Sequence, residues 1–215
     1  MKKKLVIIGA GHGISKAVAK KFGLEKYHII LIARKDEVLA EITEELSNEG
    51  ISVEYYVADA KDNESIRDVF EQIWEQHQFI DSILYNVYNN RQVNIDEETA
   101  DSITKDFKSN VAAAFTAIQL VLPDMEKNNT GTILFTGGGL ALHPMKEFGS
   151  LSIGKAGLRS LAESLHDALK PKNIFVGTVT VCGVVSENDE KYNPTKIADL
   201  FWQLQTERKQ FEIQY

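Results

Sequence analysis

The stretch KLVIIGAGHGISKAVAKKF, residues 4–22, decides the fold. It opens with an apolar run, 5–8, that is long enough for one buried strand. A glycine cluster follows, and apolar residues then recur at helical spacing. Because glycine has no Cβ, the backbone can turn sharply there and approach a pyrophosphate, while the free N–H groups of the helix's first turn face the anion. The stretch therefore predicts a strand, a phosphate-binding turn and a helix.

The spacing of the glycines Gly9, Gly11 and Gly13 differs from the common GxGxxG pattern, because Ile14 stands where the third glycine of that pattern would be. The residues fit Gly9-xxx-Gly13-x-Ser15 better, a GxxxGxG variant with serine in the last place. An ordinary strand–helix turn is the alternative. The position of the turn at the start of a full α/β alternation favours phosphate binding.

The totals of the chain indicate one globular domain, 1–215. A net charge of −7 argues against a nucleic-acid partner or an anionic membrane surface, since both need basic patches. The single cysteine, Cys182, excludes an intrachain disulfide and fits the reducing cytosol. The apolar run that opens the chain breaks into glycines too early for a signal peptide or a membrane span. We therefore expect a cytoplasmic protein.

Apolar runs and helical periodicity alternate along the rest of the chain. We expect further strands at 28–33, 51–58, 79–85, 132–136, 174–181 and 211–215, and helices at 36–48, 62–77, 97–127, 149–169 and 195–206. The helical region 97–127 should be interrupted near Asn110 and end after Pro123. The helix 149–169 carries one apolar stripe, made of Ile153, Gly157, Leu161 and Leu165.

Strands that are separated by single helices cannot pair as hairpins. They need right-handed crossovers, and they therefore build a parallel sheet with helices on both faces. The expected strands are near-continuous apolar runs, as in buried parallel sheets. The chain predicts the α/β class, a Rossmann-like, doubly wound sheet of about seven strands with ligands at the C-terminal strand ends.

The end of the second expected strand indicates which dinucleotide would bind. An acid at this place would accept hydrogen bonds from the ribose 2′-hydroxyl of NAD, but Ala33 stands there and Arg34 follows. Arg34 can pair with a 2′-phosphate instead, so NADP(H) is favoured over NAD(H). His12 adds a donor on the same side, and Asp59 can bond the adenine amino group. A solvated charge at Arg34 and a turn role for Asp59 are the alternatives. No metal site is expected.

Together these residues resemble the short-chain dehydrogenase/reductase family over nearly the whole chain. The parts that carry the resemblance are the Gly9-xxx-Gly13 turn, Asp59, Asn86 after the fourth expected strand, Asn110 in SNVAAAF, and GKAGLRSLAESL around Lys155. The resemblance implies a nicotinamide cofactor and hydride transfer to or from a carbonyl or alcohol. It also implies that Asn110 helps hold a water and proton relay and that Lys155 bonds the nicotinamide ribose.

The chain departs from the family pattern where the chemistry should be. Leu151 stands at the position of the family's tyrosine, four residues before Lys155, and Gly138 at that of its serine. Further departures are Val87 and Tyr88 for Ala-Gly, Cys182 for the proline before Gly183, and a short loop at 184–193. A positioned acid contributes roughly 10²- to 10⁴-fold in rate, so standard carbonyl reduction should be weak. Tyr88, Ser150 and His143 stay open as other donors.

Two interpretations follow. The first is an atypical NADP(H)-preferring oxidoreductase that uses Lys155 and Asn110, with a water or a substrate group as proton source. The second is a dinucleotide-binding sensor or regulatory protein without turnover; a purely structural module is a weaker third. The expected cofactor-binding residues are Gly9, Gly11, His12, Gly13, Ile14, Arg34, Asp59, Asn86 and Lys155. The substrate is not identified.

The family resemblance also implies a homodimer, because such proteins commonly pair through the two long helical regions, here 97–127 and 149–169. The small residues Ala112, Ala113 and Ala114 permit close helix approach. The alternative is that these alanines pack on the sheet.

Overall fold

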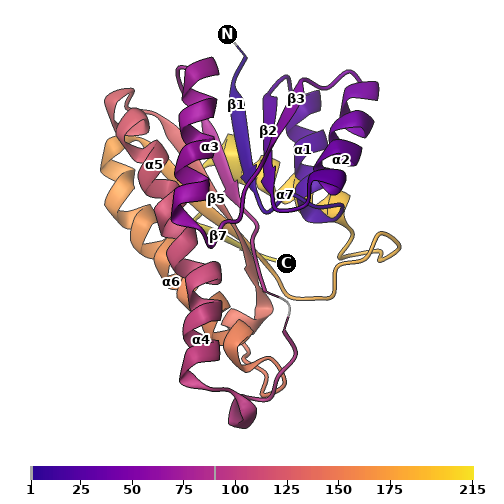
Figure 1. The fold of residues 1–215 in the computed structure, drawn as a ribbon, viewed down its shortest axis with the longest axis vertical. Helices are drawn as coiled ribbons and strands as arrows, with labels where there is room; N and C mark the ends of the chain where they lie inside the picture. Colours follow the sequence, from indigo (N-terminus) through magenta and orange to yellow (C-terminus); the bar gives the residue numbers. More distant parts are fainter. Residues whose placement is uncertain (1, 90) are drawn as a thin grey trace.

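The computed structural model describes residues 2–89 and 91–215 and contains one seven-stranded sheet in the order β3-β2-β1-β4-β5-β6-β7 (Figure 1). All neighbouring strands pair in parallel, with Leu5 opposite both Ile29 and Ser82. The strands are β1 (Lys4–Ile8), β2 (His28–Ala33), β3 (Val53–Val57), β4 (Ser82–Tyr85), β5 (Gly131–Gly138), β6 (Ile174–Val181) and β7 (Glu212–Gln214). The predicted fold class is confirmed.

Helices cover both faces of the sheet (Figure 1). They are α1 (Ile14–Leu24), α2 (Asp36–Asn48), α3 (Asn63–Gln76), α4 (Ala100–Phe107), α5 (Ala113–Lys127), α6 (Gly149–Leu169) and α7 (Pro194–Glu207). Short helical turns lie at η1 (Ile95–Glu97), η3 (Gly139–Ala141) and η4 (Lys170–Lys172), and a π-helical turn at η2 (Lys108–Ala112). In the described chain, none of the helices is long and apolar enough to cross a membrane.

Two apolar cores follow from the alternation of side chains along each strand. Val6 and Ile8 point into a core shared with α3, α5 and α6, whereas Leu5 and Ile7 point into one shared with α1, α2 and α7. Successive side chains of a strand face opposite ways, so a strand that is apolar throughout needs cover on both sides. This explains why the strand segments contain so few polar residues.

The order of the strands places a crevice at one edge of the sheet. The chain moves from β1 outward to β2 and β3, and then returns to the other side of β1 to form β4. The connections that leave β1 and β4 therefore run in opposite directions along the sheet. In sheets of this type, ligands bind in the crevice between two such connections, at the C-terminal ends of the strands. Gly9, Arg34 and Asn86 all come directly after strands that end there.

The helical region around Pro123 ends where it was predicted to end. The interruption near Asn110 is confirmed as the π-helical turn, and α5 runs through Pro123 to Lys127, while the first helix of the region, α4, begins at Ala100 rather than at residue 97. Pro123 itself is exposed, so water can reach the carbonyl that its missing N–H leaves free. Met125, one half-turn further on, is fully buried, and its burial favours continuing the helix.

The buried face of α6 also differs from the predicted stripe. Ile153 is 39% exposed, and Leu158 and Ala162 face the sheet instead. Of the predicted residues, Leu165 belongs to the buried face. Both sets repeat at helical spacing, so periodicity alone does not choose between them. The boundary of β5 differs as well, because the strand runs on to Gly138 through two of the glycines expected to follow it.

Candidate active site

A cleft of about 1070 Å³ opens at the C-terminal ends of the strands. The predicted residues that line it are Gly9, Gly11, His12, Gly13, Ile14, Arg34, Asp59, Asn86, Leu151 and Lys155. Asn110 and Gly138 are not among the lining residues. The fold therefore brings together the residues predicted to bind a cofactor, from five separate segments of the chain.

The glycine turn between β1 and α1 leaves room that side chains would fill. Gly9 has φ +88°, and a Cβ there would lie 2.8 Å from the backbone carbon of Asn86, so only glycine fits between the two strand ends. Built Cβ atoms at Gly11 and Gly13 would meet no described atom within 4 Å. The first turn of α1 carries no acid, and no side chain of the described residues caps it. This open turn at a helix N-terminus suits a phosphate group.

Asn86 holds the turn in place, a role that the motif alone did not show. Its Nδ2 donates to the carbonyl oxygen of Gly9 at 3.2 Å and to Ser15 Oγ at 2.8 Å, and Ser15 Oγ in turn donates to the Gly9 carbonyl at 2.9 Å. Ser15 is 2% exposed. The serine at the end of the glycine pattern thus ties β1, α1 and β4 together beneath the cleft.

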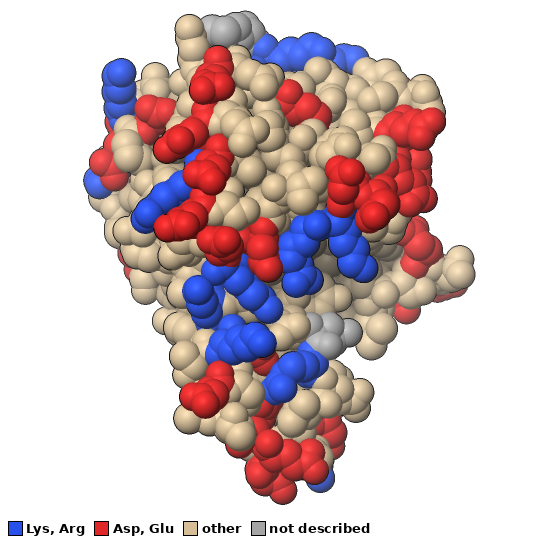
Figure 2. All heavy atoms as spheres, viewed as in Figure 1, with Lys and Arg blue, Asp and Glu red and all other residues tan. Residues whose placement is uncertain are grey.

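Basic residues stand at the end of the cleft that lies beyond β2. Arg34, Lys35 and Lys61 line this end, and Arg34 is exposed. Figure 2 shows Lys and Arg side chains gathered across the middle of one face, with acidic side chains above and below them. Within residues 2–89 and 91–215, Arg34 makes no ion pair. This guanidinium is therefore available to an anionic ligand.

His12 and Asp59 already contact other residues of the protein. His12 Nε2 lies 3.5 Å from Glu41 Oε2 on α2, and the imidazole is 49% exposed. Asp59 Oδ1 accepts a hydrogen bond from the Lys61 N–H at 3.0 Å, which is the turn role given above as its alternative. Both residues line the cleft, so a ligand contact remains a prediction for each.

Lys155 projects from α6 toward the end of β5. Its Nζ donates to the carbonyl oxygen of Thr136 at 2.9 Å and lies 5.7 Å from the centre of the Tyr88 ring. Burial lowers the pKa of Lys155 to about 8, so its ammonium form still predominates at pH 7. The ammonium has donors to spare for a hydroxyl group in the cleft, because a lysine offers three.

The positions that the family resemblance assigns to a tyrosine and a serine surround this lysine. Leu151 lines the cleft one helical turn before Lys155 and is 6% exposed. A Cβ added at Gly138 would lie 3.4 Å from Lys155 Cε, which is an ordinary contact. Neither position therefore offers a hydroxyl beside the lysine, whereas Tyr88 and His143, the other donors considered, do line the cleft.

Asn110 lies behind the wall of the cleft rather than in it. The π-helical turn tucks its side chain under α6, where a Cβ at Gly154 would lie 2.5 Å from Asn110 Nδ2. Asn110 Oδ1 accepts from the Asn89 N–H at 3.3 Å, while Nδ2 is buried without a hydrogen-bond partner in the part of the chain that the structure describes. Such an unpaired donor can be satisfied by a bound water.

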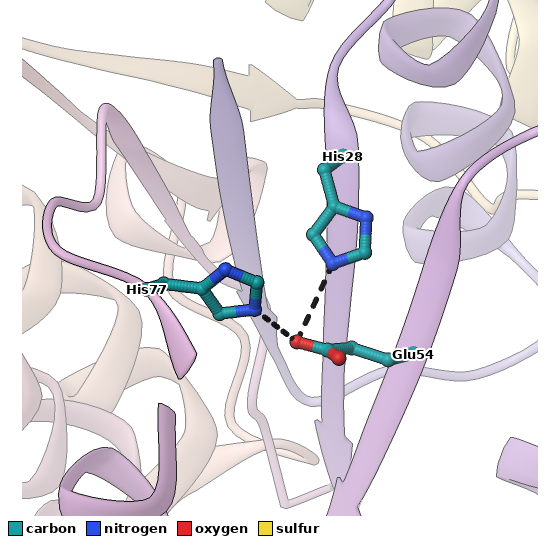
Figure 3. A group of neighbouring side chains, drawn as sticks. All are labelled: His28, Glu54 and His77. Carbon is teal, nitrogen blue, oxygen red and sulfur yellow. Dashed lines mark hydrogen bonds and ion pairs between the residues drawn. The ribbon is translucent and has the colours of Figure 1, made fainter. Parts of the chain in front are cut away.

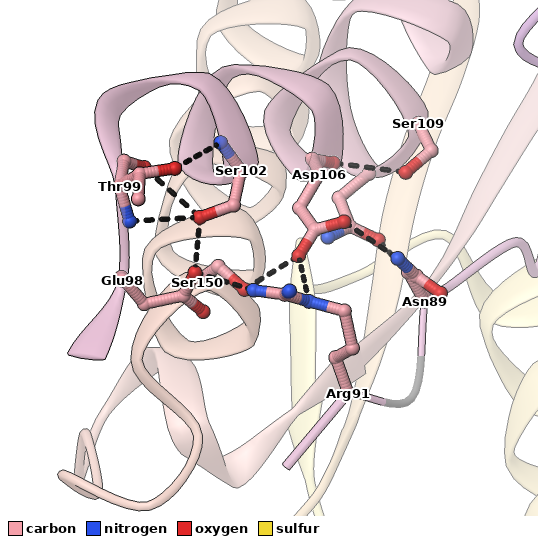
Figure 4. Close-up of polar contacts among 9 residues, drawn as sticks. Asn89, Arg91, Glu98, Thr99, Ser102, Asp106, Ser109 and Ser150 are labelled. Atoms are coloured by element: carbon pink, nitrogen blue, oxygen red, sulfur yellow. Dashed lines mark hydrogen bonds and ion pairs between the residues drawn. The ribbon is translucent and has the colours of Figure 1, made fainter. Parts of the chain in front are cut away.

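A buried polar network holds Asn89 and Arg91 against α4 and the start of α6 (Figure 4). The carboxylate of Asp106, 2% exposed, accepts from Asn89 Nδ2 at 2.5 Å, Arg91 Nε at 3.1 Å and Ser150 Oγ at 2.6 Å. Arg91 also pairs with Glu98. Burial alone would raise the pKa of Asp106, but these hydrogen bonds and the charge of Arg91 lower it below its usual value. The network links the start of α6, which carries Leu151, to α4.

Glu98 belongs to the same network, and no sequence pattern pointed to it. Its pKa falls to about 2, first because Ser102 donates a hydrogen bond to the carboxylate and then because Arg91 lies beside it. Thr99 and Ser102 cap the start of α4 with a reciprocal pair of hydrogen bonds. The entrance to α4 is thus held by polar contacts rather than by an apolar core.

The comparison with known proteins agrees with this geometry. A family model described as short chain dehydrogenase matches residues 3–197. Dehydrogenase/reductase SDR family member 4 of Sus scrofa is 27% identical over 190 residues, which cover 86% of this chain and 67% of that protein. The 17-beta-hydroxysteroid dehydrogenase type 3 of Homo sapiens is 28% identical over 209 residues, 91% of this chain and 64% of that protein. The chain thus spans about two thirds of these relatives' length.

A similar solved structure is that of a metagenomic short-chain oxidoreductase in complex with NADP. It has a TM-score of 0.88, 21% identity, and covers 99% of this chain and 95% of that one. At that identity the likeness shows the fold, whereas the family model covers most of the chain. The protein therefore belongs to the short-chain dehydrogenase family.

Proposed function

We propose that this protein is an NADP(H)-dependent oxidoreductase whose substrate needs little help from a protein acid, such as an activated double bond. The observation that carries the proposal is the arrangement of the cleft, which has an open glycine turn and the exposed Arg34 at one end and Lys155 at the other. When bound, the nicotinamide would supply or accept the hydride.

The residues of the cleft fit each part of such a dinucleotide. The N–H groups of Gly9 and Ala10 donate to the Ile32 carbonyl, whereas among the described residues those of 11–13 make no such bond, and no Cβ intrudes at Gly11 or Gly13. This part of the turn would therefore hold the diphosphate. Arg34 would pair with the 2′-phosphate, and Lys155 would donate to the hydroxyls of the nicotinamide ribose. We favour NADP(H) over NAD(H) because the end of β2 carries Ala33 and Arg34. An acid that could bind the 2′-hydroxyl of NAD does not stand there.

The protonation step is where this site would differ from the usual one. Leu151 has no proton to give, and Gly138 has no hydroxyl to orient a carbonyl. Lys155 and Asn110 Nδ2, which has no hydrogen-bond partner among residues 2–89 and 91–215, instead suit a relay through water, with the proton delivered by a water or by the substrate itself. This degenerate site disfavours simple ketones and favours substrates that are already activated.

The test is a titration of NADPH and NADH by nicotinamide fluorescence, followed by turnover against a panel of carbonyl compounds and enones. Saturable NADPH binding with oxidation of NADPH by at least one enone is the expected result. Failure of NADPH to bind would contradict the whole proposal.

A second candidate function has its own support. The lack of a hydroxyl at Leu151 and Gly138 suits a sensor or regulatory protein that binds the dinucleotide without turnover. Tight NADPH binding with no turnover across the panel would favour this second function. Turnover of any compound on the panel would exclude it.

Replacing Arg34 by Ala should weaken NADPH binding by roughly 10- to 100-fold and leave NADH binding nearly unchanged, because a hydrogen bond to a charged group contributes about 1.5–3 kcal/mol. Dissociation constants for both dinucleotides measure the effect. Arg67→Ala is the matched control, since Arg67 is an exposed arginine on α3 that does not line the cleft. An equal loss for both dinucleotides would mean that Arg34 does not read the 2′-phosphate.

We also propose that the protein forms a homodimer through α4, α5 and α6, which lie along one flank of the molecule (Figure 1). These helices expose Phe107, Phe115 and Ile153 by 41%, 40% and 39%. Of the three alanines considered above, Ala113 and Ala114 are buried within the subunit, so Ala112 alone remains exposed to a partner.

Light scattering of the wild-type protein should therefore give the mass of a dimer, and Phe115→Lys should give that of a monomer because a charge would enter the apolar contact. Leu24→Lys on α1, also at an exposed apolar residue, is the matched control and should stay dimeric. A monomeric wild-type protein would refute the proposal.

A further inference from the structure

We propose that His28, Glu54 and His77 form a binding site for a divalent transition-metal ion of the zinc type. The three side chains come from different segments: His28 begins β2, Glu54 lies in β3 and His77 follows α3 (Figure 3). His28 is the first residue of its strand, whereas the cleft takes up the opposite, C-terminal strand ends. The site is therefore separate from the dinucleotide cleft, and it does not rest on the proposed function.

The geometry of the three ligand atoms suits such an ion. Glu54 Oε1 lies 3.4 Å from His28 Nε2 and 2.6 Å from His77 Nε2, and each of the three residues offers a potential ligand atom within 4.8 Å of those of the other two. Zinc bonds of about 2.0–2.1 Å in a tetrahedron place neighbouring ligand atoms roughly 3.3–3.4 Å apart. The pair of His28 and Glu54 already has this spacing. The His77 imidazole would have to move away from the carboxylate by less than about 1 Å.

The hydrogen bonding of His28 leaves one nitrogen directed at the others. Its Nδ1 bonds Ser52 Oγ at 2.7 Å, while Nε2 is buried without a hydrogen-bond partner in the described part of the chain. Metal-binding histidines are commonly oriented in this way, by a hydrogen bond from the ring nitrogen that does not bind the metal. Figure 3 shows the Nε2 atoms of both histidines directed at the same carboxylate oxygen.

The carboxylate of Glu54 lies between the two imidazoles and makes the place suitable for a cation. Glu54 supplies the negative charge, and His77 donates to it when no ion is present. An ion would replace that hydrogen bond and give His28 Nε2 its partner.

The site is only partly buried, so an ion can enter it and keep a water as its fourth ligand. The side chains of His28, Glu54 and His77 are 17%, 26% and 15% exposed. Because the ligands come from β2, β3 and the end of α3, a bound ion would tie the edge of the sheet to that helix. We expect it to stabilise the fold rather than to take part in catalysis.

The test uses protein stripped with a chelator and titrated with ZnCl₂ by calorimetry, with CoCl₂ as a spectroscopic probe. We expect one saturable site per chain, a rise in the midpoint of thermal unfolding, and the visible absorption of a Co²⁺ ion bound by nitrogen and oxygen. His28→Asn, His77→Asn and Glu54→Gln should each weaken zinc binding by at least about 10-fold, and Ser52→Ala by roughly 10-fold.

His12→Asn is the matched control, because His12, Glu41 and Glu45 form the other cluster of potential ligands, at the protein surface. Its zinc affinity should match that of the wild type, and NADPH binding should be the same in every variant of the metal site. The near-isosteric Glu54→Gln keeps the test informative if a histidine variant fails to fold. No saturable binding to the wild-type protein would overturn the proposal. Binding that only His12→Asn removes would overturn it as well.

Discussion

The double change of Leu151→Tyr and Gly138→Ser is expected to raise NADPH-dependent reduction of simple ketones by roughly 10²- to 10⁴-fold, the usual contribution of a positioned acid. Residue 151 lines the cleft one helical turn before Lys155, so the new phenol would stand on the side of α6 that carries the ammonium. A neighbouring cation lowers the pKa of a phenol and makes it a better proton donor. The serine would fit, since a Cβ at residue 138 makes only an ordinary contact with Lys155.

The measurement is the rate of NADPH oxidation with a ketone panel, at saturating cofactor. Leu151→Phe with Gly138→Ser is the matched control, because phenylalanine has nearly the same size as tyrosine but no hydroxyl. This control should stay at the wild-type rate. An equal rate in the tyrosine and phenylalanine variants, both of them folded, would mean that residue 151 does not face the reacting group.

Replacing Asp106 by Ala should lower the free energy of unfolding by roughly 3–4 kcal/mol, because it leaves buried donors without an acceptor. Asn89, Arg91 and Ser150 all donate to this carboxylate, so the segment after β4 and the start of α6 would lose their common anchor. Denaturant unfolding followed by circular dichroism gives the value. Since Leu151 follows Ser150 directly, NADPH-dependent activity should fall in parallel.

Asp101→Ala serves as the control for this change. Asp101 lies in the first turn of the same helix, α4, but its side chain is exposed. An exposed acid at a helix N-terminus contributes about 0.3–1 kcal/mol, so the control should cost no more than that. Equal losses in the two variants would contradict the importance assigned to the buried network.

The parts of the fold that depend on local pattern could be predicted from the sequence. The glycine turn after β1 is an example, because its three glycines and the helix that follows are neighbours in the chain. The bounds of α2, α6 and β6 were also predicted correctly, since caps, glycines and apolar runs mark their ends. Arg34 could be predicted because it directly follows the apolar run of the second strand in the sequence.

The parts that depend on contacts between distant segments could not be predicted. Asp106 and Ser150 are far apart in the sequence, and so are His28, Glu54 and His77. No spacing rule connects them, because only the sheet order brings their segments together. For the same reason the sequence did not point to the metal site that we propose. The buried face of α6 was predicted wrongly, because two stripes of residues fit the helical periodicity. In the structure, the stripe that contains Leu158 packs against the sheet.

The most direct test of the account is a crystal structure of the protein grown or soaked with NADPH. The account predicts the diphosphate on the turn from Gly9 to Gly13 and the 2′-phosphate against Arg34. It also predicts the nicotinamide ribose within hydrogen-bonding distance of Lys155 Nζ. A cleft that stays empty at saturating NADPH, or a dinucleotide whose ribose lies far from Lys155, would contradict it.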